Sequence, residues 1–156
     1  MCTGRLRCRV PSAHPLFVTQ LSGHVLRFHK RSTDGSGKAD AEFTENNSDS
    51  VWGVVFEIDA HQKNALDAAE GLGDGYKEKL VQVRDPAGQM YSALMYFASR
   101  SHIDPSLKPY SWYVRFVSEG AKQHTLPANY VAAIEAVPSV NDPDTRREAR
   151  MRAIKC

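Results

Sequence analysis

The stretch Val51-Trp52-Gly53-Val54-Val55-Phe56-Glu57-Ile58 is the clearest secondary-structure signal in the chain. It is a short apolar run with β-branched and aromatic residues, which is typical of a strand. Asp59 then provides a good N-cap, and the segment 60–70 reads as a helix that Gly71 ends in the left-handed position. The pattern therefore predicts a strand that leads into a helix whose last residue is Glu70.

The remaining pattern separates strands from helices. Short strands are expected over residues 16–20, 25–30, 77–84 and 89–97, with a weak one near 41–44, and helices over 111–119, 127–137 and 144–153. Because strands fill the first two thirds and helices the last third, rather than alternating, the sequence predicts an α+β fold. We place one domain at residues 1–140 and a basic C-terminal helix or tail at 141–156.

Composition and charge narrow the class of protein. Hydrophobic content of 42% and charged content of 24% in 156 residues fit one globular domain. No apolar run approaches the roughly 20 residues that cross a bilayer, and no signal-peptide stretch opens the chain, so we expect a cytoplasmic protein with no membrane partner. The net charge of +2 is too small to indicate nucleic-acid binding. Residues 142–156, with five Lys or Arg against three Asp or Glu, account for this excess and are interpreted as a solvated face or frayed end.

The three cysteines are interpreted as reduced thiols. Their odd number argues against a disulfide framework. Cys2 and Cys8 lack the short spacing of a zinc knuckle, and Cys156 is the last residue. The sequence thus predicts neither a disulfide nor a structural metal for these residues.

Glu70 is placed at the helix end that disfavours an acid. The last carbonyls of a helix carry partial negative charge, so a carboxylate there should hold its proton more tightly, which suits general acid–base work near neutral pH. A solvated glutamate before a C-cap glycine explains the same residues, and the local pattern alone favours it. The run Gly71-Leu72-Gly73-Asp74-Gly75 follows a helix and leads into a strand, the opposite order to a phosphate-binding loop. Nucleotide binding is therefore rejected there.

Other candidate chemistry is weaker. Six histidines are scattered without a metal-binding pattern, and no Gly-x-Ser-x-Gly elbow marks a hydrolase nucleophile. Trp112 and Phe116 are typical of a core-facing stripe, and Tyr113 falls on the neighbouring face, where its hydroxyl is free for a polar ligand. The arginines near the start are interpreted as a helix surface or strand edge rather than a basic binding arm: Arg5, Arg7 and Arg9.

Several separate stretches, in matching order, resemble the γ-glutamylcyclotransferase (AIG2-like) family. The run 51–56 resembles its central strand, and Leu66-Asp67-x-x-Glu70-Gly71, with Tyr76 a few residues on, resembles the end of its catalytic helix. The C-terminal signature and the early helix and turn are matched by further segments: Tyr113, Gly120-Ala121-Lys122, Leu126-Pro127-x-x-Tyr130 and Arg9-x-Pro11-Ser12-Ala13. The resemblance covers nearly the whole chain to about Val137.

The resemblance implies a small barrel-like mixed β-sheet flanked by helices, and an enzyme that needs neither cofactor nor metal. It implies conversion of γ-glutamyl amino acids to 5-oxoproline and the free amino acid, a reaction of glutathione metabolism. Glu70 is then the general acid/base, which takes a proton from the substrate α-ammonium and returns one to the leaving amine. By the same resemblance Tyr113 and Tyr76 contact the substrate, and Gly71 lets the chain turn beside it.

One part of the family pattern has no counterpart. Family members hold the γ-glutamyl group in a Tyr-Gly-Ser-Asn loop after a first strand, and Met1-Cys2-Thr3 aligns just after that loop. We therefore expect an N-terminally truncated domain with an unpaired sheet edge and little or no activity. Alternatives stay open: γ-glutamylamines or a γ-glutamyl-protected intermediate as substrate, or a non-catalytic relative that binds a partner. A homodimer is also left open.

Overall fold

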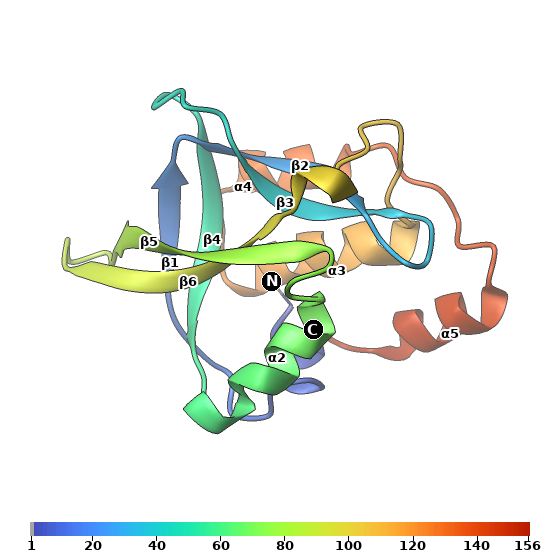
Figure 1. Cartoon of the computed structure of the whole chain (residues 1–156), viewed down its shortest axis with the longest axis horizontal. Helices are drawn as coiled ribbons and strands as arrows, with labels where there is room; N and C mark the ends of the chain where they lie inside the picture. The colour runs from blue at the N-terminus through green and yellow to red at the C-terminus, as the bar shows by residue number, and fades with distance from the viewer. Residues whose placement is uncertain (1) are drawn as a thin grey trace.

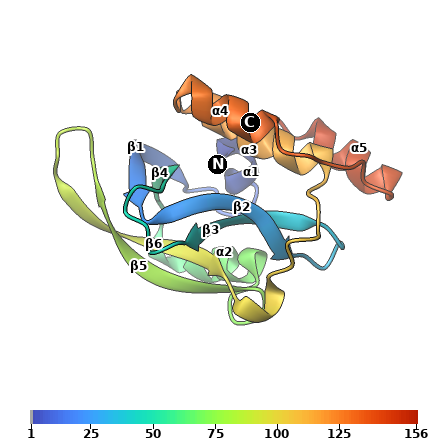
Figure 2. The ribbon, with the colours of Figure 1, turned by 90° about the horizontal axis from the view of Figure 1, so that it is seen from above.

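A computed structural model describes residues 2–156, which form six strands and five α-helices (Figure 1). The strands are β1 (His14–Ser22), β2 (His24–Arg31), β3 (Gly37–Phe43), β4 (Ser50–Glu57), β5 (Tyr76–Arg84) and β6 (Met90–Ala98). The helices are α1 (Thr3–Arg7), α2 (Lys63–Glu70), α3 (Ser111–Gln123), α4 (Ala128–Glu135) and α5 (Thr145–Ala153), with 3₁₀ turns at Ala60–Gln62 and Arg100–His102. Figure 2 shows α3, α4 and α5 together on one side of the strands, and Figure 1 shows α2 below β5 and β6.

The strands pair as three antiparallel ladders. β1 pairs with β4, β2 with β3, and β5 with β6. Because β1 also contacts β5, β2 contacts β4 and β3 contacts β6, the strands follow one another around a ring. Across two of these junctions, the Thr19 hydroxyl donates to the Arg84 carbonyl and the Ala98 N–H donates to the Asp40 carboxylate, each at 2.8 Å. Side chains thus join ladders that backbone hydrogen bonds leave separate.

The predicted α+β class is confirmed. The strands surround a common interior in the barrel-like manner expected, although the ladders within residues 2–156 do not close into a hydrogen-bonded barrel. Pairing in the ladders is antiparallel, and parallel contacts occur only as isolated bridges between Leu72 and Tyr76 and between Tyr110 and Val140. Since each described strand has one ladder partner, unpaired strand edges lie at the junctions between ladders. That a missing first strand leaves an exposed edge stays a prediction.

Most predicted elements are present with boundaries shifted by a few residues. The largest shift concerns β3, which begins at Gly37, whereas a weak strand was expected only near 41–44. Its inward-facing Asp40 is polar and pairs with His29 at 3.0 Å, so the strand lacks the apolar alternation that marks a strand in sequence. The helix predicted over 60–70 begins as a 3₁₀ turn, and the Asp59 side chain makes no capping hydrogen bond.

The core lies between α3 and the strands. Trp112 and Phe116 are each 2% exposed, which confirms the predicted core-facing stripe. Another face of α3 packs with α4 through Val114 and Ile134 onto apolar residues of β1, β2 and β4. None of the helices in the described part of the chain combines the length and apolar character that crossing a bilayer requires.

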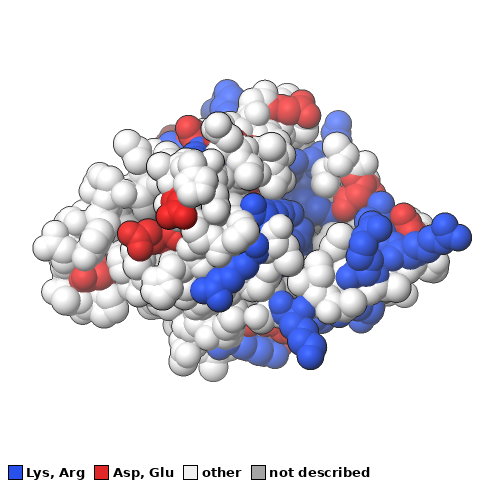
Figure 3. Space-filling model, turned by 90° about the horizontal axis from the view of Figure 1, so that it is seen from below, with Lys and Arg blue, Asp and Glu red and all other residues white. Residues whose placement is uncertain are grey.

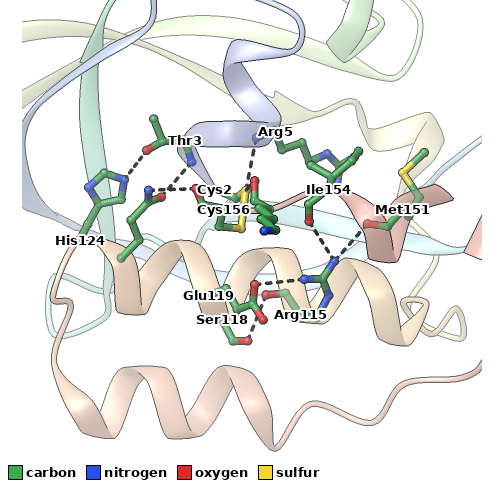
Figure 4. Close-up of a disulfide and its surroundings, with 12 residues drawn as sticks. Cys2, Thr3, Arg5, Arg115, Ser118, Glu119, His124, Met151, Ile154 and Cys156 are labelled. Atoms are coloured by element: carbon green, nitrogen blue, oxygen red, sulfur yellow. Dashed lines mark hydrogen bonds and ion pairs between the residues drawn. A yellow bond between two sulfur atoms is a disulfide. The ribbon is translucent and has the colours of Figure 1, made fainter. Parts of the chain in front are cut away.

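The prediction of three reduced thiols is wrong for two of them. Cys2 and Cys156 form a disulfide, and Cys8 is a free, exposed thiol (Figure 4). The pairing depends on packing between α1 and the C-terminal segment: a Cβ at Gly4 would lie 2.2 Å from the Lys155 carbonyl oxygen. A contact between residues at opposite ends of the sequence leaves no local pattern, and cysteine counting therefore missed it.

The basic C-terminal segment packs on the helical side of the molecule. Arg115 of α3 donates to the carbonyl oxygens of Met151 and Ile154 at 3.0 and 3.4 Å (Figure 4). Figure 3 shows Lys and Arg side chains gathered at the right-hand end of the molecule, where Figure 1 places α5. The division of the chain at residue 140 stays a prediction.

Candidate active site

Glu70 ends α2 at the point where the chain reverses direction. Gly71 adopts φ 67° and ψ 47°, the left-handed conformation that glycine reaches without steric cost. The Gly71 and Leu72 N–H groups donate back to the carbonyls of Ala68 and Asp67. This is the C-terminal cap predicted from the sequence, and it holds the Glu70 side chain at the end of the helix.

The Glu70 carboxylate is half paired. Arg9 Nη1 donates to Glu70 Oε1 at 2.8 Å, whereas Glu70 Oε2 has no hydrogen-bond donor among residues 2–156. The Glu70 side chain is 23% exposed, so solvent and small molecules can reach it. The positive charge of Arg9 and the partial negative charge of the helix end act on this carboxylate with opposite signs. Sequence reasoning anticipated the helix end and missed the arginine, which lies 61 residues away.

A cavity of about 330 Å³ opens beside Glu70. The residues around it come from α2, from the turn that follows, from the end of β2, and from the second 3₁₀ turn. They include Glu70, Gly71, Gly75, Lys30 and His102. Tyr113 and Tyr76, the other predicted site residues, do not line this cavity. A second cavity of about 360 Å³, lined by Arg27, Phe28, His29, Glu42 and Pro105, contains none of the predicted site residues.

Tyr113 and Tyr76 are bound to one peptide unit of β3. The Ala39 N–H donates to the Tyr113 hydroxyl at 3.1 Å, and the Tyr76 hydroxyl donates to the Ala39 carbonyl at 2.7 Å. The Tyr76 proton is therefore committed. The Tyr113 hydrogen has no protein acceptor in the described part of the chain, so Tyr113 can donate it to a ligand.

The two tyrosines lie close enough to Glu70 to sense its charge. Burial raises the pKa of Tyr113 above its usual value, and the negative charge of Glu70 adds to this effect, while Ala39 and Arg5 oppose it. Burial likewise raises the pKa of Tyr76 far above its usual value, with further contributions from Tyr113 and Glu70. Both phenols consequently stay protonated near neutral pH and can act as hydrogen-bond donors.

Two cations of the site have no carboxylate partner among the described residues. The Arg5 guanidinium lies over the rings of Tyr113 and Phe116, 5.3 and 4.7 Å from their centroids. The Lys30 ammonium lies 4.7 Å from the centre of the Tyr76 ring. Burial lowers the pKa of Arg5 and of Lys30, and in both cases the charge of Glu70 acts in the opposite direction. Sequence reasoning gave neither residue a role, because an unpaired charge is visible only after folding.

Metal binding receives no support from the arrangement. No group of three or more His, Cys, Asp or Glu side chains in residues 2–156 is placed to hold a metal ion. The ionisable side chains that line the cavity beside Glu70 are those of Asp74, Lys30, Arg31 and His102.

Comparisons with known proteins show which family the chain belongs to. A model of the AIG2-like family matches residues 50–134, more than half of the chain. The chain belongs to the AIG2-like family. A human protein named gamma-glutamylcyclotransferase is 29% identical over 142 residues, which cover 88% of this AIG2-like chain and 73% of the relative. A solved structure named gamma-glutamyl cyclotransferase superposes with a TM-score of 0.82 at 25% identity, over 96% of this chain and 91% of that one.

A second solved structure, of an uncharacterized human protein, superposes with a TM-score of 0.81 at 26% identity and covers 97% of this AIG2-like chain and 92% of that one. The chain is thus γ-glutamylcyclotransferase-like in both sequence and fold. Glu70, Tyr76 and Tyr113 fall within the segment that the family model matches, whereas Arg5 and Lys30 precede it.

Proposed function

We propose that this chain cyclises γ-glutamyl amino acids to 5-oxoproline and a free amino acid, with Glu70 as the general acid/base. The missing Tyr-Gly-Ser-Asn loop led us to expect little or no activity, but the carboxylate and the cavity beside it are both present in residues 2–156. The substrate α-nitrogen attacks the γ-carbonyl carbon of the same molecule, and the amide bond to the leaving amino acid breaks. Over the reaction the α-nitrogen loses two protons and the leaving nitrogen gains two. Glu70 carries protons between these nitrogens and ends in its starting state.

The observation that carries the proposal is the half-paired carboxylate of Glu70 at the edge of an open cavity. Arg9 fixes Oε1 by a hydrogen bond, and Oε2 is left for a proton. Because the nucleophile is already tethered to the carbonyl, positioning supplies much of the rate and one acid/base can suffice. The names of the similar proteins point to the same reaction class.

The remaining predicted site residues receive roles that follow from their contacts. Tyr113 has a free hydroxyl hydrogen but does not line the cavity, so in this proposal it binds the part of the substrate that extends beyond the cavity. Tyr76 holds Ala39, and with it Tyr113, in position. Gly71 brings the backbone past the carboxylate without a side chain in the cavity. The unpaired cations match the charge of the substrate class, since a γ-glutamyl amino acid carries two carboxylates.

Product identity tests the proposal. The purified chain is incubated with γ-glutamyl-alanine, and the products are separated by liquid chromatography against a sample without enzyme. We expect 5-oxoproline and alanine in equal amounts and no glutamate. Glutamate in place of 5-oxoproline would indicate hydrolysis, and no release above the enzyme-free rate would indicate a binding protein. Either outcome would contradict the proposal.

We also propose that the chain acts in the cytoplasm, as an enzyme of glutathione metabolism. Fractionation of cells with thiols blocked at lysis tests the location. Because reducing compartments keep most thiols reduced, isolation of the protein with an intact Cys2–Cys156 disulfide would argue for another compartment.

A further inference from the structure

Lys30 is a buried cation without a protein partner. It is only 9% exposed, yet none of the ion pairs or hydrogen bonds of residues 2–156 involves its ammonium group. The neighbouring cation is matched, because Arg31 pairs with Asp104 at 3.3 Å. A buried charge without a partner costs free energy, so an unmatched ammonium in a cavity is a candidate ligand-binding group.

The turn after α2 lies directly against this ammonium. A Cβ placed on Gly75 would lie 2.4 Å from Lys30 Nζ and 2.6 Å from Lys30 Cε. Gly75 is not among the glycines with positive φ, so its backbone conformation does not demand glycine. A side chain at position 75 would therefore have to push the flexible end of Lys30 out of its present place. The Tyr76 ring covers another side of the ammonium.

Lys30 and Glu70 line the same cavity. In the proposed reaction Glu70 delivers a proton to the leaving nitrogen. If the leaving group is an amino acid, its carboxylate carbon lies two bonds, or about 2.5 Å, from that nitrogen. A cation on the wall of this cavity can therefore meet the carboxylate of the leaving amino acid while Glu70 meets its nitrogen.

We propose that Lys30 binds the carboxylate of the leaving amino acid and so restricts this enzyme to γ-glutamyl amino acids over γ-glutamylamines. The inference rests on the proposed cyclisation and adds the substrate class. In this inference Lys30 selects the substrate, and Glu70 transfers the protons.

Two matched substrates test the inference. γ-Glutamyl-alanine and γ-glutamyl-ethylamine differ only by the carboxylate of the leaving group. We expect Lys30→Met to lower kcat/KM for γ-glutamyl-alanine by about 10- to 100-fold, the usual worth of a charge-assisted hydrogen bond, and to leave γ-glutamyl-ethylamine within about 2-fold. Gly75→Ala should displace the ammonium and produce a smaller loss of the same selective kind.

Arg27→Met is the control. Arg27 is also a cation of β2, but it is exposed and pairs with Glu42 at 3.1 Å. Its loss should therefore leave kcat/KM unchanged for both substrates. Thermal unfolding of Lys30→Met should occur at or above the wild-type temperature, since the variant removes a buried unpaired charge.

Equal losses for both substrates, or no loss for either, would overturn the inference. Equal losses would place Lys30 against the glutamyl part of the substrate or on Glu70 itself. If neither substrate yields 5-oxoproline with the wild-type chain, the proposed cyclisation fails as well, so the two failures are distinguishable.

Discussion

Two carboxylates of the molecule, Asp142 and Glu70, differ in how many hydrogen bonds they accept. Asp142 accepts two hydrogen bonds from the Arg147 guanidinium at 2.5 and 2.6 Å, one from Trp112 Nε1 at 2.8 Å and one from the Asp144 N–H at 2.9 Å. Glu70 accepts one hydrogen bond, from Arg9. Asp142 therefore has no oxygen left for another donor, and Glu70 has one.

This difference in pairing distinguishes a carboxylate that stabilises the fold, Asp142, from one in the candidate active site, Glu70. The contacts of Asp142 join α3 to the segment before α5, and the carboxylate that makes them is fully buried. The surroundings of Glu70 instead contain Arg5 and Lys30 without carboxylate partners and a Tyr113 hydroxyl with a free hydrogen. Groups that are unsatisfied in the folded chain are those that can act on a substrate.

The largest expected effect is on the rate of cyclisation. Glu70→Gln keeps the shape of the side chain and removes its ability to accept a proton. We expect the steady-state rate to fall by about 10²- to 10⁴-fold, the range for a general acid/base, with little change in the unfolding temperature. Glu57→Gln, an exposed carboxylate at the end of β4, is the matched control and should retain wild-type activity. An equal loss in both variants would contradict the role of Glu70.

The opposite pattern is expected for Asp142→Asn. The asparagine amide is uncharged and has only one acceptor oxygen, so it cannot accept the four hydrogen bonds that the carboxylate accepts. The unfolding temperature should therefore fall by about 5–10 °C. The activity of the folded fraction, measured well below that temperature, should stay near the wild-type value. Loss of activity at unchanged stability would show that Asp142 is not merely structural.

Acid should affect the Asp142 region in a predictable direction. The Arg147 guanidinium holds the pKa of Asp142 well below its usual value. The stabilisation is therefore complete above the unfolded-state pKa, about pH 4, and is lost as the pH falls toward the folded-state value. Tryptophan fluorescence, from Trp52 and Trp112 together, measures this loss in denaturant titrations between pH 6 and 2. Asp142→Asn should show a shallower dependence on pH over this range.

The smallest expected effect concerns Arg9. Arg9→Met removes the hydrogen bond that positions Glu70, and we expect about a 5- to 10-fold loss of rate together with a shifted pH–rate profile. Arg9→Lys should recover part of the rate, because it keeps the charge. A profile that does not shift would mean that Arg9 supports the fold without positioning Glu70.

Local patterns in the sequence predicted the strand that contains Trp52, the helix that ends at Glu70 and the cap at Gly71. These features depend on residues close in the chain, and the structure confirms them. The ion pair of Arg9 with Glu70 and the Cys2–Cys156 disulfide join residues far apart in the sequence, so no periodicity reveals them.

The burial of the Lys30 ammonium group could not be predicted from the sequence either. A lysine in an amphipathic strand is usually solvated, and only the folded chain brings Gly75 and the Tyr76 ring against its ammonium group. The first half of β3 was not predicted for a related reason: the polar side chain of Asp40 points inward and pairs with His29. Buried polar groups reverse the pattern on which sequence reading depends.

A single-turnover measurement tests most directly whether Glu70 moves the proton. Wild-type chain and Glu70→Gln, each in excess over γ-glutamyl-alanine, are mixed with the substrate, and 5-oxoproline is measured over time while binding is followed separately by calorimetry. We predict that both chains bind the substrate and that Glu70→Gln releases 5-oxoproline about 10²- to 10⁴-fold more slowly than the wild-type chain. Release by Glu70→Gln at the wild-type rate would contradict the account.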